Sequence, residues 1–363
     1  MRTTPRHARA TLPVLSLALV ACIGRGHVPY QGPAETASAQ AAGATAPPPP
    51  WTEALLEEPS PVTVTPRRRV GRYRTLDLVL PSTGDNRQDG NLVRARYYRR
   101  ERAGKRGVVF VVPIWGRSSQ PPLLVARRIL RYGELDVIRL LEDRPLFDWG
   151  EIRESPTPED FRAEVQRSAD AFAATAVDLG RLLDWALARP DVDPERVGIV
   201  GFSMSAMVAS VAAGIDGRFT HGVFVLASTD LAWVFSECPH RTRRVREAVL
   251  ERFGWTRTEF RRQITPILDP INPEDLAGGI HPSRVLFVQA ARDACMPQPA
   301  SDALWERLGR PELLTVDANH RNAFLALTLV DAFRLTRRIG GFLHRTGGPL
   351  PGASRVATAG TAD

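Results

Sequence analysis

Short apolar runs alternate along the chain with longer stretches in which apolar residues recur every three or four positions. The continuous apolar run at residues 107–112 is typical of a strand buried on both faces of a parallel sheet. Further strands are predicted at residues 73–80, 92–98, 135–140, 197–200, 222–226, 284–289 and 313–316. Helices are predicted at residues 123–131, 157–187, 205–214 and 323–338. This alternation predicts an α/β domain with a mostly parallel central sheet flanked by helices.

The clearest helix lies before the strand at residues 197–200. Thr157 offers an N-cap, Pro158 suits the first helical position, and Pro190 ends the helix. Residues 191–194 then form a turn back into the strand. This helix–turn–strand order predicts one crossover of the sheet. Residues 73–80 and 92–98, which are separated by a short turn-forming segment, are expected to pair as antiparallel strands.

A long insertion separates the strands at residues 222–226 and 284–289. Its charged helical segments carry Trp233, Phe235 and Trp255. The length of the insertion predicts a helical cap at about residues 230–280. The aromatic residues either line an apolar pocket below the cap or pack its core.

The two ends of the chain have a different composition. Residues 22–67 are rich in Ala, Pro, Gly, Thr and Ser, and include four consecutive prolines at positions 47–50. Such a segment buries too little apolar surface to order itself, so we expect a disordered tether. Residues 347–363 are similarly small and polar and are expected to be a disordered tail. The folded domain is therefore predicted at residues 68–346.

The first residues resemble an export signal. Three arginines, at positions 2, 6 and 9, precede an apolar run at residues 11–20, which is too short to span a bilayer. The sequence Leu-Val-Ala-Cys that ends at Cys22 resembles the bacterial lipobox. The resemblance implies that residues 1–21 are a signal peptide and that Cys22 is acylated, with palmitate or a similar chain, and anchors an exported lipoprotein to a membrane. Ile23 favours the outer membrane in a cell that has two. An ordinary signal peptide cleaved near Ala21 is the alternative.

Charge and cysteine usage narrow the possible partners. The formal net charge is +8, but Lys105 is the only lysine and the arginines are dispersed among acidic residues, so we expect no nucleic-acid partner. The cysteines and histidines lack metal-ligand spacing, and no Gly-rich phosphate loop follows a strand, so no metal or cofactor is expected. Cys238 and Cys295 form one disulfide or remain two buried thiols; the sequence leaves both open.

The strand at residues 197–200 continues through Gly201 and Ser203 into an apolar helix. A serine at such a sharp corner is exposed, and the next backbone N–H, that of Met204, is free to bind an oxyanion. This segment resembles the nucleophile elbow of the α/β-hydrolase superfamily, although Ser205 stands where the usual Gly-x-Ser-x-Gly pattern ends in glycine. A serine that merely caps a helix is the alternative interpretation.

The resemblance covers roughly residues 72–342 and implies an α/β-hydrolase fold. It implies that His320, after the last strand, is the general base, and that Asp293, after the preceding strand, orients it. His344 is a weaker candidate for the base, and Asp302 and Asp317 are weaker candidates for the acid. Asp293 could instead cap a turn. The second oxyanion donor is expected to be the amide of Trp115, with that of Ile114 as the alternative.

The implied function is that of a serine esterase. The chain is most similar to the compact branch that contains dienelactone-hydrolase-like and acetyl-esterase-like proteins. Its substrate would be a small-molecule ester of unspecified acyl length, cleaved through an acyl-enzyme on Ser203. An amidase or peptidase with the same triad is one alternative. The other is an inactive surface-binding lipoprotein on a hydrolase scaffold. The oligomeric state is not indicated.

Overall fold

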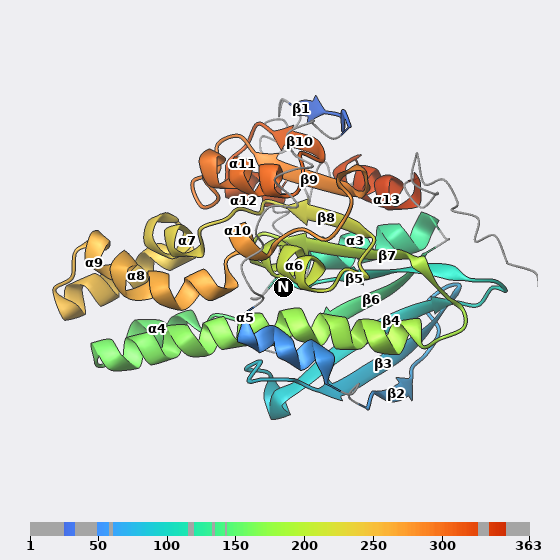
Figure 1. The fold of residues 1–363 in the computed structure, drawn as a ribbon, viewed down its shortest axis with the longest axis horizontal. Helices are drawn as coiled ribbons and strands as arrows, with labels where there is room; N and C mark the ends of the chain where they lie inside the picture. Colours follow the sequence, from blue (N-terminus) through green and yellow to red (C-terminus); the bar gives the residue numbers. More distant parts are fainter. Residues whose placement is uncertain are drawn as a thin grey trace, which may run out of the picture.

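The strands of the computed structural model form one large sheet (Figure 1). The structure describes residues 25–32, 49–57, 61–114, 120–132, 135–141, 144–325 and 334–345. Within these ranges the strands are β1 Arg25–Val28, β2 Thr63–Pro66, β3 Tyr73–Pro81, β4 Leu92–Arg100, β5 Arg106–Val111, β6 Leu135–Leu141, β7 Val192–Phe202, β8 His221–Val225, β9 Val285–Ala290 and β10 Glu312–Val316. Their order across the sheet is β1-β10-β9-β8-β7-β5-β6-β4-β3-β2.

The centre of the sheet is parallel and its two margins are antiparallel. Strands β6, β5, β7, β8, β9 and β10 all run in one direction. Strands β4, β3 and β2 continue the sheet antiparallel on one side, and β1 pairs antiparallel with β10 on the other. The predicted mostly parallel sheet and the predicted antiparallel pairing of β3 with β4 are both confirmed.

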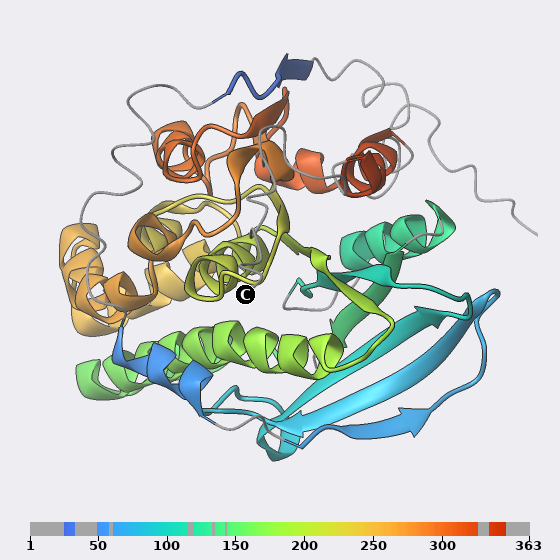
Figure 2. The same ribbon diagram turned by 45° about the vertical axis from the view of Figure 1, so that its right-hand side comes forward.

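Helices cover both faces of the sheet, as the uninterrupted apolar strands require. In β5, Val108 and Phe110 belong to one buried cluster, and Val109 and Val111 belong to the other. The first face packs against α5 Pro158–Leu187 and α6 Met204–Ile215, and the second packs against α3 Gln120–Tyr132 and α13 Arg334–Arg345. Figures 1 and 2 show these two layers. Because successive strand side chains point to opposite faces, one short apolar run supplies both cores.

The start of α5 follows from its sequence. The Oγ1 atom of Thr157 accepts a hydrogen bond from the Asp160 amide at 3.1 Å, and Pro158 occupies the first turn. The predicted N-cap and proline position are therefore confirmed. The helix crosses back to β7, so the predicted crossover before Ser203 is also present.

The insertion between β8 and β9 is helical, as predicted. It contains α7 Leu231–Glu237, α8 Arg241–Phe253, α9 Arg257–Leu268, a 3-10 turn Asp269–Ile271 and α10 Pro273–Leu276. In Figure 1, α7, α8 and α9 lie with α4 Trp149–Glu154 at one end of the molecule. We call residues 230–280 the cap.

Two of the three cap aromatics are packing residues. The ring of Phe235 lies 4.8 Å from those of both Phe147 and Trp149, and Trp255 lies 5.6 Å from Phe161. These contacts join the cap to the rest of the domain. They assign Phe235 and Trp255 to the core of the cap rather than to a substrate pocket.

The expectation of a disordered tether at residues 22–67 does not hold for three stretches. These are β1, a 3-10 helix Pro50–Leu56, and β2. Strand β1 pairs with the edge of β10, and Arg181 Nη2 donates to the Ala54 carbonyl at 2.9 Å. Composition alone misses β1 and the 3-10 helix because their partners lie far away in the sequence, whereas β2 pairs with the nearby β3. Residues 22–24, 33–48 and 58–60 of the tether, the signal peptide and the tail fall outside the described residues.

A short 3-10 helix, Asp89–Asn91, lies between β3 and β4, and the remaining described helices lie in the C-terminal part of the domain. These are a 3-10 turn Pro282–Arg284, α11 Gln298–Arg307 and α12 His320–Leu325. The single helix predicted at residues 323–338 is represented by α12 and α13, because the residues between them are not described. No helix within the described ranges has the length and apolar character needed to cross a bilayer.

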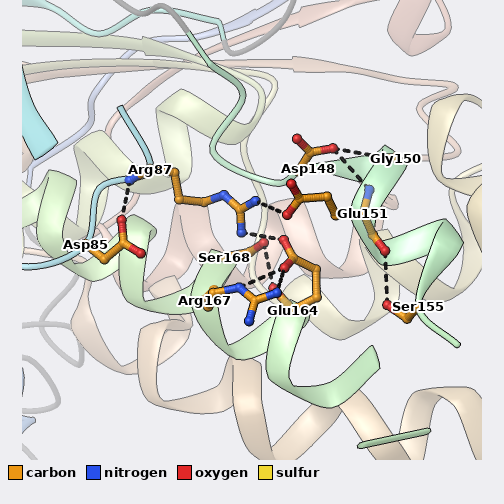
Figure 3. Close-up of polar contacts among 9 residues, drawn as sticks. All are labelled: Asp85, Arg87, Asp148, Gly150, Glu151, Ser155, Glu164, Arg167 and Ser168. Atoms are coloured by element: carbon orange, nitrogen blue, oxygen red, sulfur yellow. Dashed lines mark hydrogen bonds and ion pairs between the residues drawn. The ribbon is translucent and has the colours of Figure 1, made fainter. Parts of the chain in front are cut away.

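An ion-pair cluster fastens the β3–β4 turn to α4 and α5 (Figure 3). The carboxylate of Glu164, which is buried on α5, pairs with Arg87 from the turn and with Arg167 from its own helix. Arg87 also reaches Glu151 on α4, with Nη2 2.9 Å from Oε2. The buried carboxylate is therefore paired with two guanidinium groups, as burial of a charge requires.

Candidate active site

Ser203 lies at the corner between β7 and α6. Its backbone φ is 53°, a conformation that residues other than glycine adopt only where the surroundings enforce it. Its amide donates to the Val225 carbonyl at 2.7 Å. A Cβ on Gly201 would lie 2.2 Å from the Ser205 carbonyl oxygen, so glycine at this position lets α6 pack directly on the strand. The local sequence thus builds a sharp strand-to-helix corner.

Ser205 fits this corner by bonding to the strand end. Its side chain is fully buried, and its Oγ accepts from the Phe202 amide at 2.8 Å and donates to the Phe202 carbonyl at 2.9 Å. The departure from glycine therefore adds two hydrogen bonds beside Ser203. Sequence reasoning considered only the size of this side chain and missed its bonding.

His320 begins α12, shortly after β10 ends. Its Nε2 atom lies 3.1 Å from Ser203 Oγ. The ring of Phe324, one turn later on α12, packs edge-on at 5.0 Å from the imidazole and restricts its orientation. Phe324 was not predicted as a site residue, although its spacing of four from His320 places both on one helix face.

Asp293 occupies the turn after β9. Its Oδ2 atom lies 2.6 Å from His320 Nδ1, and its Oδ1 accepts from the amides of Cys295 at 2.8 Å and Met296 at 2.9 Å. A carboxylate can only accept, so the proton in this contact is on Nδ1. The Nε2 lone pair then points to the hydroxyl of Ser203.

The fold brings these three residues together from positions far apart in the sequence. Ser203, Asp293 and His320 follow β7, β9 and β10, which are parallel strands of one sheet. The carboxyl ends of parallel strands share one edge, where sites of α/β sheets commonly form. Ser203 and His320 meet there although 117 positions separate them.

The weaker candidates have other positions. Asp302 accepts from Gln298 Nε2 at 2.8 Å, and Asp317 pairs with Arg292 at 3.2 Å on the surface. His344 lies on α13, which packs against α3 on one face of the sheet. Among these acids and histidines, Asp293 and His320 are the ones that form a hydrogen-bonded relay with Ser203.

Of the two expected oxyanion donors, the structure describes Met204 but not Trp115. Met204 is the first residue of α6, and the first amides of a helix have no acceptor inside it. Trp115 lies outside the described residues, so its role stays a prediction. Ile114, the alternative, is described and half-buried, and packs against the α3 side of the core.

A disulfide connects the cap to the turn that carries Asp293. The sulfur atoms of Cys238, at the end of α7, and Cys295 are bonded at 1.96 Å. His240 follows two positions after Cys238. Burial lowers the pKa of His240, its electrostatic interaction with His320 lowers it further, and Asp293 opposes this. The corner between α7 and α8 therefore lies beside the Asp293–His320 pair.

The described residues contain no group of three or more His, Cys, Asp or Glu side chains that could hold a metal ion. Ser203, His320 and Asp293 together offer nucleophilic chemistry. A hydroxyl, a base and an orienting carboxylate are aligned, which is the arrangement that activates serine.

The comparisons with known proteins bear on the fold. Acetyl xylan esterase 1 from Thermoanaerobacterium sp. JW/SL YS485 superposes with a TM-score of 0.58 at 14% identity, over 92% of this chain and 99% of that one. The acetyl xylan esterase from Paenibacillus sp. R4 gives a TM-score of 0.58 at 15% identity, over 91% and 99%. No family model matches the sequence, and no curated protein matches it. The sheet order, the flanking helices and these neighbours show an α/β-hydrolase fold.

Proposed function

We propose that the chain is a serine hydrolase that cleaves carboxylic esters through an acyl-enzyme. The observation that carries the proposal is the continuous relay from Ser203 Oγ to His320 Nε2 at 3.1 Å and from His320 Nδ1 to Asp293 Oδ2 at 2.6 Å. A serine hydroxyl is a weak nucleophile at neutral pH unless a correctly oriented base takes its proton.

In the acylation step, Ser203 Oγ forms a bond to the ester carbonyl carbon while its proton moves to His320 Nε2. The carboxylate of Asp293 stabilises the resulting imidazolium without taking its proton. The Met204 amide binds the oxyanion, together with the amide predicted from Trp115. The intermediate then collapses, the carbon–oxygen bond to the alcohol breaks, and His320 returns its proton to the departing oxygen.

Deacylation repeats these transfers with water. His320 takes a proton from the water, whose oxygen attacks the acyl carbon, and then returns that proton to Ser203 Oγ as the acid leaves. Neighbouring groups support the roles of His320 and Asp293 in both steps. Phe324 and the two amides on Asp293 Oδ1 hold the base and the acid in the orientation that both steps need.

We propose esters of short acyl groups as the first substrates, with acetyl esters of carbohydrate alcohols foremost. This rests on the names of the two structural neighbours, both acetyl xylan esterases. An amide would use the same relay, so matched ester and amide substrates with one acyl group distinguish an esterase from an amidase.

The decisive test combines turnover with active-site labelling. We expect the protein to hydrolyse p-nitrophenyl acetate and to react with a fluorophosphonate probe at Ser203. Ser203→Ala should abolish labelling and lower kcat by at least about 10³-fold, because the nucleophile is lost. His320→Ala should cause a similar loss.

Ser210→Ala provides the control, because Ser210 is a buried serine on the same helix whose hydroxyl donates to the Met207 carbonyl. We expect it to label and turn over like the unaltered protein. Equal labelling of the unaltered protein and Ser203→Ala would overturn the assignment. Absence of both turnover and labelling in the unaltered protein would favour the inactive binding protein.

A further inference from the structure

We propose that the Cys238–Cys295 disulfide is a positioning element for the catalytic acid, which holds Asp293 toward His320 by fastening its turn to the cap. The inference rests on the proposed function, since it assigns a role within the same relay. It concerns two cysteines that the hydrolytic mechanism itself does not use.

On the acid side, the disulfide lies within the turn that orients the carboxylate. The Cys295 amide donates to Asp293 Oδ1 at 2.8 Å, and the next amide, that of Met296, donates to the same oxygen at 2.9 Å. These two bonds leave Oδ2 directed at His320 Nδ1. Any displacement of Cys295 therefore moves a donor that sets the direction of the carboxylate.

On the cap side, the disulfide is attached to a well-anchored corner. The Cys238 carbonyl accepts from Thr242 Oγ1 at 2.9 Å and from Arg246 Nη1 at 3.4 Å. Arg246 is only 2% exposed and also donates to the Phe235 carbonyl at 3.2 Å. Its cation lies at the carbonyl end of α7, where a helix dipole favours positive charge. The corner between α7 and α8 is thus a fixed support.

The link bridges parts of the chain that are 57 positions apart. Both cysteines are buried, at 6% and 3% exposure, beside a carboxylate whose side chain is 2% exposed. Within the turn, short-range backbone bonds hold Asp293, and the Arg292 amide also ties the turn to the Ala318 carbonyl at 3.0 Å. Joining Cys295 to Cys238 couples it to the packed cap, and this preorganises the acid for catalysis.

The test removes the disulfide and measures both geometry and rate. In Cys238→Ala/Cys295→Ala we expect kcat for p-nitrophenyl acetate to fall about 10- to 100-fold, with a smaller change in KM, because a modest misplacement of a catalytic group costs that much. We also expect loss or an upfield shift of the downfield proton resonance of His320 Nδ1–H, assigned by its absence in His320→Ala. Reduction of the folded, unaltered protein provides a second route if the variant folds poorly.

A double-mutant cycle separates positioning from general stability. If the disulfide acts through the acid, removing the disulfide from the Asp293→Asn variant should cost little further activity. The losses caused by the disulfide removal and by Asp293→Asn should therefore be strongly non-additive. Val249→Ala is the matched control, because it removes buried volume from α8 and leaves both the disulfide and the residues of the acid turn unchanged. We expect it to lower the melting temperature but to leave kcat and the resonance unchanged.

The outcomes distinguish this inference from the proposed function. If the disulfide-free variant keeps both the resonance and kcat and loses only thermal stability, the positioning role is wrong. If the unaltered protein shows the resonance but neither turnover nor labelling, the esterase proposal fails. The response of the resonance to loss of the disulfide then still decides the inference.

Discussion

Ser205 determines how the end of β7 is held next to the proposed nucleophile. Phe202 is the last residue of β7, and the neighbouring strand β5 has already ended there. The Phe202 amide therefore donates to Ser205 Oγ, and the same hydroxyl donates to the Phe202 carbonyl. Phe202 is fully buried, so water has little access to these groups. One hydroxyl therefore satisfies the strand end and limits the freedom of the corner at Ser203.

We expect Ser205→Ala to lower the free energy of unfolding by about 1–3 kcal/mol, because it leaves a buried amide without its acceptor. The rate of fluorophosphonate labelling at Ser203 should also fall, since the corner loosens. Urea denaturation and labelling kinetics measure the two effects. Ser210→Ala, which removes only a donor from the same helix, should show a smaller loss of stability and normal labelling. Unchanged stability and labelling in Ser205→Ala would contradict a structural role for the hydroxyl.

Among the elements, α5 has a structural role beyond covering the sheet. Its buried Glu164 carries the ion-pair cluster of Figure 3, which joins the β3–β4 turn and α4 to the helix. Arg87 makes both inter-element contacts, one with Glu164 in the interior and one with Glu151 at the surface. The two pairs share a guanidinium but differ in solvent exposure.

Arg87→Ala should destabilise the fold by roughly 3–5 kcal/mol, because a buried carboxylate loses one of its two guanidinium partners. Glu151→Ala is the matched change at the exposed end, and it should cost at most about 1 kcal/mol because water screens that pair. Chemical denaturation of the two variants provides the comparison. Equal losses in both would show that burial does not control the strength of the cluster.

On the scale of the whole molecule, the first described strand begins close in sequence to the predicted anchor. Strand β1 begins only three positions after Cys22 and pairs with the β10 edge. Three extended residues reach at most about 11 Å. We propose that acylation of Cys22 anchors an exported protein with this edge of the sheet close to the membrane. The disulfide accords with export, because disulfides persist in oxidising compartments.

Expression in a bacterial host with a lipoprotein pathway tests the anchor. The unaltered protein should partition with membranes and into the detergent phase, whereas Cys22→Ser should be released, because it lacks the acylated residue. Ester hydrolysis by Cys22→Ser should remain normal, since Cys22 is remote in sequence from the relay. Equal membrane partition of both proteins would refute lipid anchoring through Cys22.

Local sequence patterns determined most of the elements. Short apolar runs predicted the strands from β3 to β10, and apolar residues at every third or fourth position predicted the long helix α5, because burial of one or both faces imposes those patterns. The corner at Ser203 was recognisable for a similar reason, since Gly201, a preceding strand and a following helix are local features. The sequence did not reveal β1 or the Pro50–Leu56 helix, whose order depends on distant surfaces.

Tertiary structure decided which of these features meet. The distances from Ser203 to His320 and from His320 to Asp293 arise because three parallel strands end at one edge. The sequence left the pairing of Cys238 with Cys295 open, since no local pattern reports the approach of residues 57 positions apart. It likewise could not show that Ser205 bonds to Phe202. The sequence by itself specified which segments form strands, helices and a sharp corner, because those depend on near neighbours. Only the folded chain fixed the hydrogen bonds between them, because these depend on how the sheet and cap pack.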